Sequence, residues 1–345
     1  MSDKKKKRLR ILSRVVFFLN IVFAALLLLS YTLPYAVPKS FPTLSVLSLL
    51  VPVFIIINFI FMLFWILSVR KQFLLSFIVL ILGYSHVFSM YQFSSYPTKA
   101  SENSLSVMSY NVRLFNIYNW IKKSNVDKKI VDLVHSTSPK IIAFQEFHQN
   151  QKEAFNFYPY QHVVLRGKKK KVGQAIFSKV PIIHKGSIEF PNTSNNAIYI
   201  DIVQNNDTIR IYNLHLQSLR IDHKNEELSQ KNSERLLKRM ATAFKMQQSQ
   251  AELFEMNRKN CKYKTIILGD FNNTQFSHVY KKIKGDMKDA FSEAGSGFGK
   301  TWEFPYFPLR IDFILTDPSF TINAFKTFTE HYSDHFPIYS VISLD

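Results

Sequence analysis

The sequence predicts an α/β chain in which a two-sheet β-sandwich flanked by helices follows three transmembrane helices. Three observations support this fold class. The first hundred residues contain three long apolar runs, and the composition changes sharply near residue 100. Beyond that point, short runs rich in Val, Ile, Phe and Tyr alternate with turn residues and with two helical stretches. Many strands covered by a few helices are typical of layered α/β domains.

The three apolar runs are long enough to cross a bilayer. They cover about residues 15–33, 44–69 and 73–90, and each has close to the roughly 20 residues that span the hydrocarbon core. Buried core helices are the alternative, but three such runs leave no polar face for water. The basic stretch from Lys4 to Arg10 also fits a cleaved signal peptide. The two later runs favour its retention, so residues 1–95 are predicted to form a membrane anchor.

The distribution of cations predicts the orientation of this anchor. The N-terminal basic cluster and the pair Arg70 and Lys71 lie two spans apart, whereas residues 31–43 contain only Lys39. Because cytoplasmic loops are enriched in Lys and Arg, we expect a cytoplasmic N-terminus. Three crossings then place the rest of the chain outside the cytoplasm, on the periplasmic side of a multi-pass inner-membrane protein. The lipid bilayer is thus an expected partner, and the sequence indicates no obligate protein partner.

The net charge of +19 is shared by both parts of the chain. Up to residue 100 there are 11 basic residues and one acidic residue, and beyond it 33 basic and 24 acidic residues. The first excess fits attraction to a membrane surface, and the second suits an anionic substrate such as nucleic acid or a phospholipid headgroup. Cys261 is the only cysteine, so no intramolecular disulfide can form and the soluble part must be stabilised by its core.

A short polar segment, residues 96–104, predicts a linker, and residues 105–345 then form one soluble domain. Its predicted strands are rich in β-branched and aromatic residues. They are Ser106–Arg113, Lys140–Glu146, Gly173–Phe177, Ala197–Val203, Thr208–Gln217, Thr265–Asp270, Arg310–Leu315 and Ile338–Leu344. Helices are predicted over Asn125–Ser136 and from Asn232 to about Asn257. The basic run Lys168–Lys171 fits either a solvated hairpin tip or a clamp for an anionic substrate or membrane surface.

Polar residues stand at the ends of several predicted strands, where a purely structural sheet would carry other types. Glu146 and Asp270 share the strand parity of apolar side chains, and a carboxylate there is costly to bury unless it is paired or binds a metal. Each residue alone has a simpler explanation, such as a turn or a helix cap. Together they predict a convergent site. Its candidates are Asn111, Glu146, Asn213, His215, Asp270, Asp312, Asp334 and His335.

In their order along the chain, these residues resemble the motifs of the endonuclease/exonuclease/phosphatase superfamily, which includes pancreatic-type deoxyribonuclease, abasic-site endonucleases and neutral sphingomyelinases. The resemblance covers about residues 106–345, and its most specific parts are LGDFN and SDHFPI. It implies a deoxyribonuclease-like four-layer sandwich in a membrane-anchored bacterial member. Arg113 stands where some relatives carry an acidic metal ligand, and NVRLF matches the deoxyribonuclease-like form. The segment around Asp312 lacks the Cys-Asp-Arg form of inositol polyphosphate phosphatases.

This resemblance implies a metal site and a substrate site. Glu146 would be the principal metal ligand, with Asn111 and Asp334 at the same position or a second one. Hard oxygen ligands without a cysteine cluster favour magnesium or manganese over zinc. The resemblance also implies that Arg113 and Asn213 contact the substrate.

The resemblance further implies the catalytic roles. Asp270 would orient and deprotonate the attacking water, and Asn272 would hold that water or the phosphate. His335, oriented by Asp312, would bind the phosphoryl oxygen as negative charge develops. His215 would contact phosphate and assist the leaving group.

The predicted activity is metal-dependent hydrolysis of an anionic phosphate ester, with a nuclease-like phosphodiesterase as the first choice. The alternative is a sphingomyelinase-like phospholipid phosphodiesterase or phosphatase that acts on the membrane. Both use the same site, and a fold alone does not separate them. A catalytically inactive binding module is a third hypothesis, disfavoured because every expected position holds a competent residue.

Overall fold

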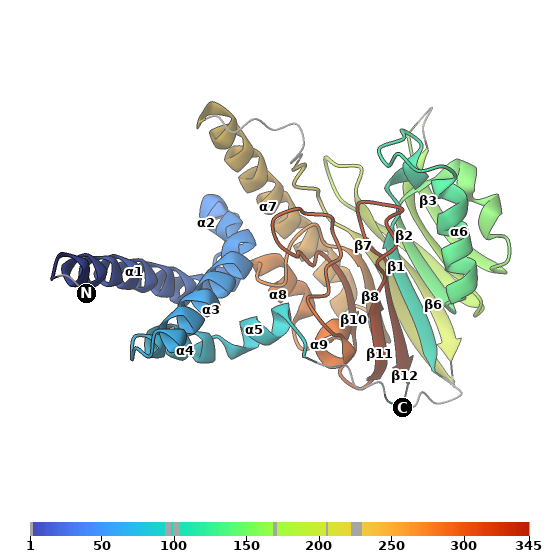
Figure 1. Ribbon diagram of the computed structural model, residues 1–345. Coiled ribbons are helices and arrows are strands. Elements are labelled where there is room, and N and C mark those ends of the chain that lie inside the picture. Colours follow the sequence, from blue (N-terminus) through green and yellow to red (C-terminus); the bar gives the residue numbers. More distant parts are fainter. Residues whose placement is uncertain are drawn as a thin grey trace.

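Two six-stranded sheets pack face to face in the computed structural model of the soluble part (Figure 1). The structure describes residues 3–93, 98, 104–167, 171–204, 206–221 and 230–344. The first sheet has the order β11 (Thr321–Thr327), β12 (Ile338–Ser343), β1 (Leu105–Asn111), β2 (Ile141–His148), β4 (Val172–Ser178), β3 (Tyr160–Arg166). The second has the order β5 (Ile182–Glu189), β6 (Asn196–Gln204), β7 (Asp207–His215), β8 (Lys264–Asp270), β10 (Asp312–Thr316), β9 (Lys288–Asp289).

All eight strands expected from the sequence are present, with ends shifted by a few residues. The sequence pattern does not predict β3, β5, β9 and β11, and these are the four edge strands of the two sheets. Most of the predicted linker and Lys168 to Lys170 lie outside the described residues.

The space between the sheets is filled by aliphatic side chains. They alternate along each strand with side chains on the outer face, as the period of two requires. Burying a Val, Leu or Ile side chain contributes roughly 1.5–3 kcal/mol relative to exposure. The fully buried members include Leu105, Val107, Ile141, Ala143, Ile176, Ile198, Ile200, Ile209, Ile211, Ile266 and Leu268.

Helices cover both outer faces. On the first sheet, α6 (Val126–Thr137) buries Val126, Ile130 and Val134, which recur every four residues. On the second sheet lie α7 (Gln230–Lys259) and α8 (His278–Lys284), and a short α9 (Ala290–Ala294) packs beside β10 and β11. The sequence predicts α6 and α7 but not the two short helices. The result is the expected sandwich of helix, sheet, sheet and helix (Figure 1).

Strand direction decides where the ends of the strands meet. β1 and β2 are parallel, as are β7 and β8, while the other pairs are antiparallel. Because β10 runs opposite to β8 and β12 opposite to β1, these two strands begin at the edge where the parallel pairs end.

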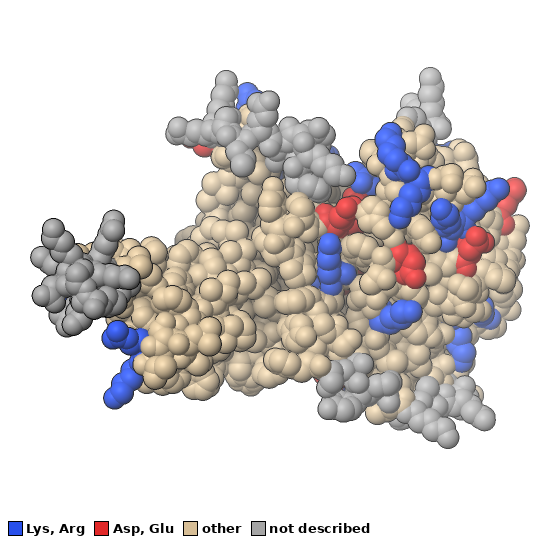
Figure 2. Space-filling view, in the orientation of Figure 1, with Lys and Arg blue, Asp and Glu red and all other residues tan. Residues whose placement is uncertain are grey.

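The N-terminal part is a bundle of apolar helices at one end of the molecule (Figure 1). Its elements are α1 (Asp3–Ser30), η1 (Leu33–Tyr35), α2 (Pro42–Val46), η2 (Leu47–Leu50), α3 (Val51–Leu67), α4 (Phe73–Leu82) and α5 (Tyr84–Met90). Within the described residues, two helical segments are long and apolar enough to cross a membrane, Ile11–Tyr35 and Pro42–Leu67. On the face in view, Lys and Arg side chains lie at the end of the bundle away from the sandwich, and side chains of both charges lie over the sandwich, with a largely uncharged region between (Figure 2).

The third predicted span is not one straight helix. α4 and α5 are bent by 79° at a break next to Gly83. A Cβ at Gly83 would lie 2.0 Å from the Tyr31 ring, so glycine is what allows α1 to approach the bend. The pair counts as a third span only if its two parts are taken together.

Polar side chains inside the bundle bind one another. Nδ2 of Asn20 donates to Oγ of Ser76 at 2.6 Å, Ser76 donates to Oδ1 of Asn58 at 3.2 Å, and Nε1 of Trp65 donates to Oδ1 of Asn20 at 3.0 Å. All four side chains are at most 1% exposed. Interhelical hydrogen bonds of this kind hold α1, α3 and α4 together where apolar contacts alone give little specificity.

Candidate active site

Strand direction brings the polar strand ends of both sheets to one edge of the sandwich. His215 at the end of β7 pairs with Asp270 at the end of β8, and Asp312 at the start of β10 lies opposite the same residue. From the other sheet, Nδ2 of Asn111 donates to Oδ2 of Asp270 at 3.0 Å. His335 lies in the loop that leads into β12. The structure therefore brings these five predicted residues together.

Asp270 is the buried centre of this edge and is 0% exposed. Its Oδ1 accepts from the backbone N–H of Asn272 at 2.7 Å, and its Oδ2 accepts from Nδ2 of Asn272 and of Asn111, each at 3.0 Å. The preceding Gly269 has a φ of 146°, and a Cβ there would lie 2.0 Å from the carbonyl oxygen of Leu214. Only glycine fits this close crossing, which explains its place in the LGDFN motif.

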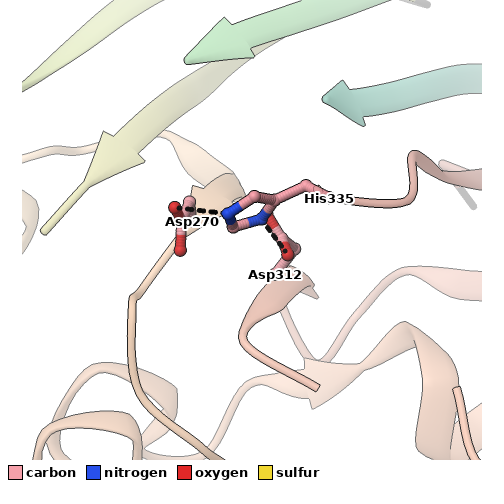
Figure 3. A group of neighbouring side chains, drawn as sticks. All are labelled: Asp270, Asp312 and His335. Atoms are coloured by element: carbon pink, nitrogen blue, oxygen red, sulfur yellow. Dashed lines mark hydrogen bonds and ion pairs between the residues drawn. The ribbon is translucent and has the colours of Figure 1, made fainter. Parts of the chain in front are cut away.

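His335 lies between two carboxylates (Figure 3). Its Nδ1 is 3.0 Å from Oδ2 of Asp312, and its Nε2 is 3.8 Å from Oδ2 of Asp270. Asp312 is itself fixed, because its backbone N–H donates to Oγ1 of Thr301 at 3.1 Å. The contact with Asp312 sets the orientation of the ring and leaves Nε2 facing the site.

Burial and neighbouring charges shift the pKa values of the titratable groups in different directions. Burial opposes the charge on His335, but Asp312 and Asp270 outweigh it and raise the pKa of His335 to about 10. Burial, assisted by the charge on His335, lowers the pKa of His215 to about 3. Burial raises the pKa of Asp270 to about 7 against the opposing effect of His335. Near neutral pH, the site therefore holds a cationic His335, a neutral His215 and a carboxyl group able to exchange a proton.

Asp270, Asp312 and His335 offer potential metal ligands within 4.8 Å of one another. A protonated imidazole has no lone pair for a cation, and Asp312 is already engaged by Nδ1 of that ring. This cluster is therefore better suited to proton transfer and charge stabilisation than to metal binding.

Glu146 reaches the site through a β-bulge. By simple alternation it would lie with Ile142 and Phe144, whose side chains pack in the outer layer with α6. The pairing of β2 with β4 shifts between Phe144 and Phe147, and Glu146 has a φ of 51°. The carboxylate consequently meets the site, where Oε1 accepts from Nδ2 of Asn111 at 3.3 Å. Glu146 therefore does not share the face of Ile142 and Phe144, contrary to what simple alternation predicts. A non-glycine residue in the left-handed region commonly marks a functional constraint.

Arg113 and Asp334 form an ion pair at the rim of the site. Nη1 of Arg113 lies 3.1 Å from Oδ2 of Asp334, and the two side chains are 35% and 23% exposed. The guanidinium also stacks over the Trp120 ring, 4.5 Å from its centroid. A part-exposed pair of this kind contributes little stability, so the guanidinium can exchange this partner for a substrate phosphate. The ion pair engages Oδ2 of Asp334, and the carboxylate keeps further lone pairs for a cation.

A model of the endonuclease/exonuclease/phosphatase family matches residues 108–335, a range that includes the whole site. The chain belongs to the endonuclease/exonuclease/phosphatase family. Residues 13–90 match a second family model, described as a domain of unknown function (DUF8431). No curated protein matches the sequence.

Solved structures with this fold cover most of the chain. An endonuclease/exonuclease/phosphatase family protein from Bacteroides thetaiotaomicron is 20% identical with a TM-score of 0.54, and the match covers 72% of this chain and 100% of that one. A mannosyl-6-phosphatase from the same species is 19% identical with a TM-score of 0.54, covering 70% and 100%. TDP2 from D. rerio, complexed with a single-strand DNA product, is 16% identical with a TM-score of 0.52, covering 70% and 99%. At identities below 25%, these structural similarities show a shared fold alone.

Members of the endonuclease/exonuclease/phosphatase family are generally divalent-metal-dependent phosphoesterases. Glu146 has the properties of a cation ligand, because burial and then the charge of Asp334 raise its pKa, while its hydrogen bond from Asn111 is long. His335 and Arg113 favour the charged form, but the pKa of this partly buried carboxyl stays raised overall, and a bound cation would stabilise the carboxylate. Asn111 directs its amide hydrogens to Glu146 and Asp270, and its Oδ1 accepts from the Arg113 N–H at 3.1 Å. The second lone pair of Oδ1 of Asn111 is available to a cation.

Asn213 lies beneath the site rather than at its surface. The side chain is 0% exposed, and Nδ2 donates to the carbonyl oxygens of Phe144 at 2.8 Å and Ala175 at 3.4 Å. Its Oδ1 accepts from Nε2 of Gln145 at 2.7 Å. These bonds connect β7 to β2 and β4 of the other sheet. This geometry does not support the substrate contact predicted from the sequence and indicates that Asn213 holds the two sheets together below the site.

Replacing Asn213 with leucine should therefore lower stability and leave substrate affinity unchanged. The free energy of unfolding is expected to fall by about 2–3 kcal/mol, because buried groups on β2 and β4 lose their partner. Denaturant unfolding and the KM of the folded fraction check this. A raised KM with unchanged stability would instead restore the substrate-binding role.

Three further residues, which are not among the candidates from the sequence, orient the site. Oγ1 of Thr301 accepts from the backbone N–H groups of Ile311 and Asp312. Oγ of Ser333 donates to the carbonyl oxygen of Asn111 at 2.8 Å, joining the His335 loop to β1. Trp120 supports Arg113. Ser333 begins the SDHFPI motif and could have been found there, whereas nothing in the sequence links Thr301 or Trp120 to the site.

Proposed function

We propose that the protein is a membrane-anchored, divalent-metal-dependent phosphodiesterase with a nuclease-like reaction. The observation that carries this proposal is the convergence of a cationic His335, a proton-accepting Asp270 and a Glu146 with a raised pKa at one edge of the sandwich. The three side chains match the three requirements of phosphate ester hydrolysis: an activated water, a stabilised phosphoryl charge and a cation. An inactive binding module has no need for such costly buried charges.

The residues of the site divide the chemistry among them. Asp270 accepts a proton from the attacking water, which Asn272 helps to hold. His335 donates from Nε2 to the phosphoryl oxygen as its negative charge grows, and Asp312 keeps the ring in place. His215 contacts the phosphate near the leaving group, and Arg113 binds a neighbouring phosphate oxygen.

Glu146, with Asn111 and Asp334 nearby, would hold Mg²⁺ or Mn²⁺. Such a cation, when bound, supplies Lewis acidity to the phosphoryl group.

Nucleic acid is the favoured substrate class. The 33 basic and 24 acidic residues after residue 100 suit a polyanion, and the solved TDP2 structure of the same fold carries a single-strand DNA product. A phospholipid is the second candidate, because exposed aromatic side chains continue from α5 onto the catalytic domain. Phe93 is 76% exposed and Phe298 is 43% exposed, and both contact Tyr91. Such aromatics are typical of the membrane interface.

The test uses the full chain in detergent micelles with Mg²⁺, against single-stranded DNA, RNA, phospholipid and mannose 6-phosphate. We expect phosphodiester cleavage of nucleic acid that EDTA abolishes and Mg²⁺ restores. The Asp270→Asn variant is the matched control for contaminating enzymes. Cleavage of phospholipid alone would select the second candidate, and hydrolysis of the monoester alone would contradict a phosphodiesterase.

We further propose that the chain crosses the inner membrane three times with a cytoplasmic N-terminus. The segments after α1 and before α3 contact α8 and α7 of the catalytic domain, and α5 contacts α9. α1 and α3 therefore have one end near this domain, and α4 returns the chain from the Arg70 and Lys71 turn to the same side. The exposed Tyr84 and Phe88 of α5 would then lie in the interfacial layer.

This topology predicts opposite results for two reporter fusions. Alkaline phosphatase fused after Ser343 should be active, because it reaches the periplasm, and a cytoplasm-dependent fluorescent protein at the same position should be dark. Fusions after Lys71 should give the reverse pattern and serve as the control. A fluorescent C-terminal fusion would place the catalytic domain in the cytoplasm.

A further inference from the structure

The loop that follows Asp270 is buried in the membrane anchor. Phe276 is 1% exposed, and it belongs to the same apolar cluster as Leu27 of α1, Val51 of α3 and Val79 of α4. The His86 ring of α5 stacks on Phe276 with 5.8 Å between centroids and 10° between planes. A side chain of the catalytic domain is thus part of the core of the helical bundle.

One carbonyl oxygen at the end of α5 accepts hydrogen bonds from two side chains that are close in sequence to Asp270 and Asp312. The oxygen of Ser89 accepts from Nε2 of Gln275 at 3.2 Å and from Nη2 of Arg310 at 3.3 Å. Gln275 is five residues after Asp270, and Arg310 is two residues before Asp312. The end of α5 therefore holds together the segments that carry both carboxylates facing His335.

The loop from Asp270 to Phe276 transmits this restraint because it is bonded along its length. The backbone N–H of Asn272 binds Asp270, and the carbonyl oxygen of Asn272 accepts from Nε2 of Gln247 at 3.1 Å. Nδ2 of Asn273 donates to Oε1 of Gln247 at 2.7 Å. Because the loop is held by these hydrogen bonds, a shift of Phe276 should also shift Asp270.

Arg310 is equally constrained. Its Nη1 lies 2.7 Å from Oδ2 of Asp289, and both side chains are 1% exposed. The guanidinium also lies 4.6 Å from the Phe291 centroid and 4.7 Å from the Phe313 centroid. The bond to Ser89 thus attaches a rigid part of the catalytic domain to the anchor.

We propose that the membrane anchor positions the active site, with His86, Gln275 and Phe276 as positioning residues that couple α5 to Asp270. Displacing α5 moves the carboxylate relative to His335. The kinetic part of this inference rests on the proposed phosphoesterase function. The structural part, the coupling of α5 to the loop after Asp270, does not.

The test compares His86→Ala with His86→Phe in the full chain, reconstituted in lipid nanodiscs. Alanine removes the ring that stacks on Phe276, and phenylalanine restores a ring. We expect kcat to fall about tenfold in His86→Ala with KM within twofold, because small misplacements of reacting groups are costly. His86→Phe should recover most of the loss. His162→Ala, which removes a half-buried histidine of β3 away from the anchor, is the control and should keep wild-type kcat.

Amide hydrogen exchange of residues 271–277 gives a readout that needs no substrate. Exchange should be faster in His86→Ala and near wild type in His86→Phe. Gln275→Met, which keeps the length of the side chain but removes the donor to Ser89, should reproduce the effect if His86→Ala does not fold. Unchanged exchange would overturn the coupling even if no phosphate ester is hydrolysed. Faster exchange with unchanged kcat would overturn the positioning role.

Discussion

Glu146→Gln should lose metal binding and activity while the apoprotein keeps its fold. The side chain keeps its size, so the bulge with its left-handed backbone at residue 146 can persist. Because burial raises the pKa of Glu146, a neutral amide removes a desolvation cost, and the metal-free variant should be at least as stable as the wild type. The loss of a cation that stabilises phosphoryl charge should lower kcat by at least about 10²-fold.

Thermal unfolding with and without Mg²⁺ measures the metal effect independently of any substrate. A ligand that binds only the folded state stabilises it by about 2.7 kcal/mol at one hundred times its Kd. We therefore expect Mg²⁺ to raise the melting temperature of the wild type and of the control Glu293→Gln, whose side chain is exposed on α9. The melting temperature of Glu146→Gln should not respond. An equal response in all three proteins would assign the cation to other ligands.

The sequence predicts those helices and strands that bury one face against the core. The eight predicted strands include all the central ones, whose alternating aliphatic side chains fill the space between the sheets. The four missed strands are edge strands, whose outer side lacks a neighbour and whose sequences alternate less regularly. β5, for example, exposes His184 and Lys185 in succession. Periodicity is weak where burial is incomplete.

The sequence could not predict features that depend on contacts between distant elements. The bend lies next to Gly83, where the ring of Tyr31, just after α1, occupies the space of a side chain. The apolar composition of this segment predicts membrane affinity, but it does not predict the contact between Tyr31 and Gly83. Glu146 could be recognised as functional by its motif, but its direction depends on a bulge that simple alternation does not contain. Asn213 is a candidate from the sequence, but its partners lie on the opposite sheet and no pattern within its own strand indicates them.

The pairing of His335 with Asp312 was expected from the resemblance, and the structure places their side chains 3.0 Å apart. The catalytic roles of both stay a prediction. If His335 acts on the charge that develops in the transition state, His335→Ala should lower kcat by about 10²-fold or more with little change in KM. The substitution also removes the imidazolium that pairs with the buried carboxylate of Asp312, which lowers stability. The melting temperature must therefore be measured alongside the kinetics. His162→Ala, which removes a half-buried histidine hydrogen-bonded to Gly186 on another part of the sandwich, is the control.

Asp312→Asn should give a similar but smaller loss of kcat. The amide keeps the volume, but it no longer provides the charge that outweighs burial and raises the pKa of His335. His335 is still present, but its cationic form is less favoured and its ring is held less firmly in the orientation that the reaction needs. Because the two residues act as a unit, the double variant should be far less impaired than the product of the single defects. Steady-state kinetics on the three variants decides this, since independent and multiplicative losses would mean that Asp312 is a structural strand residue and that His335 acts without it.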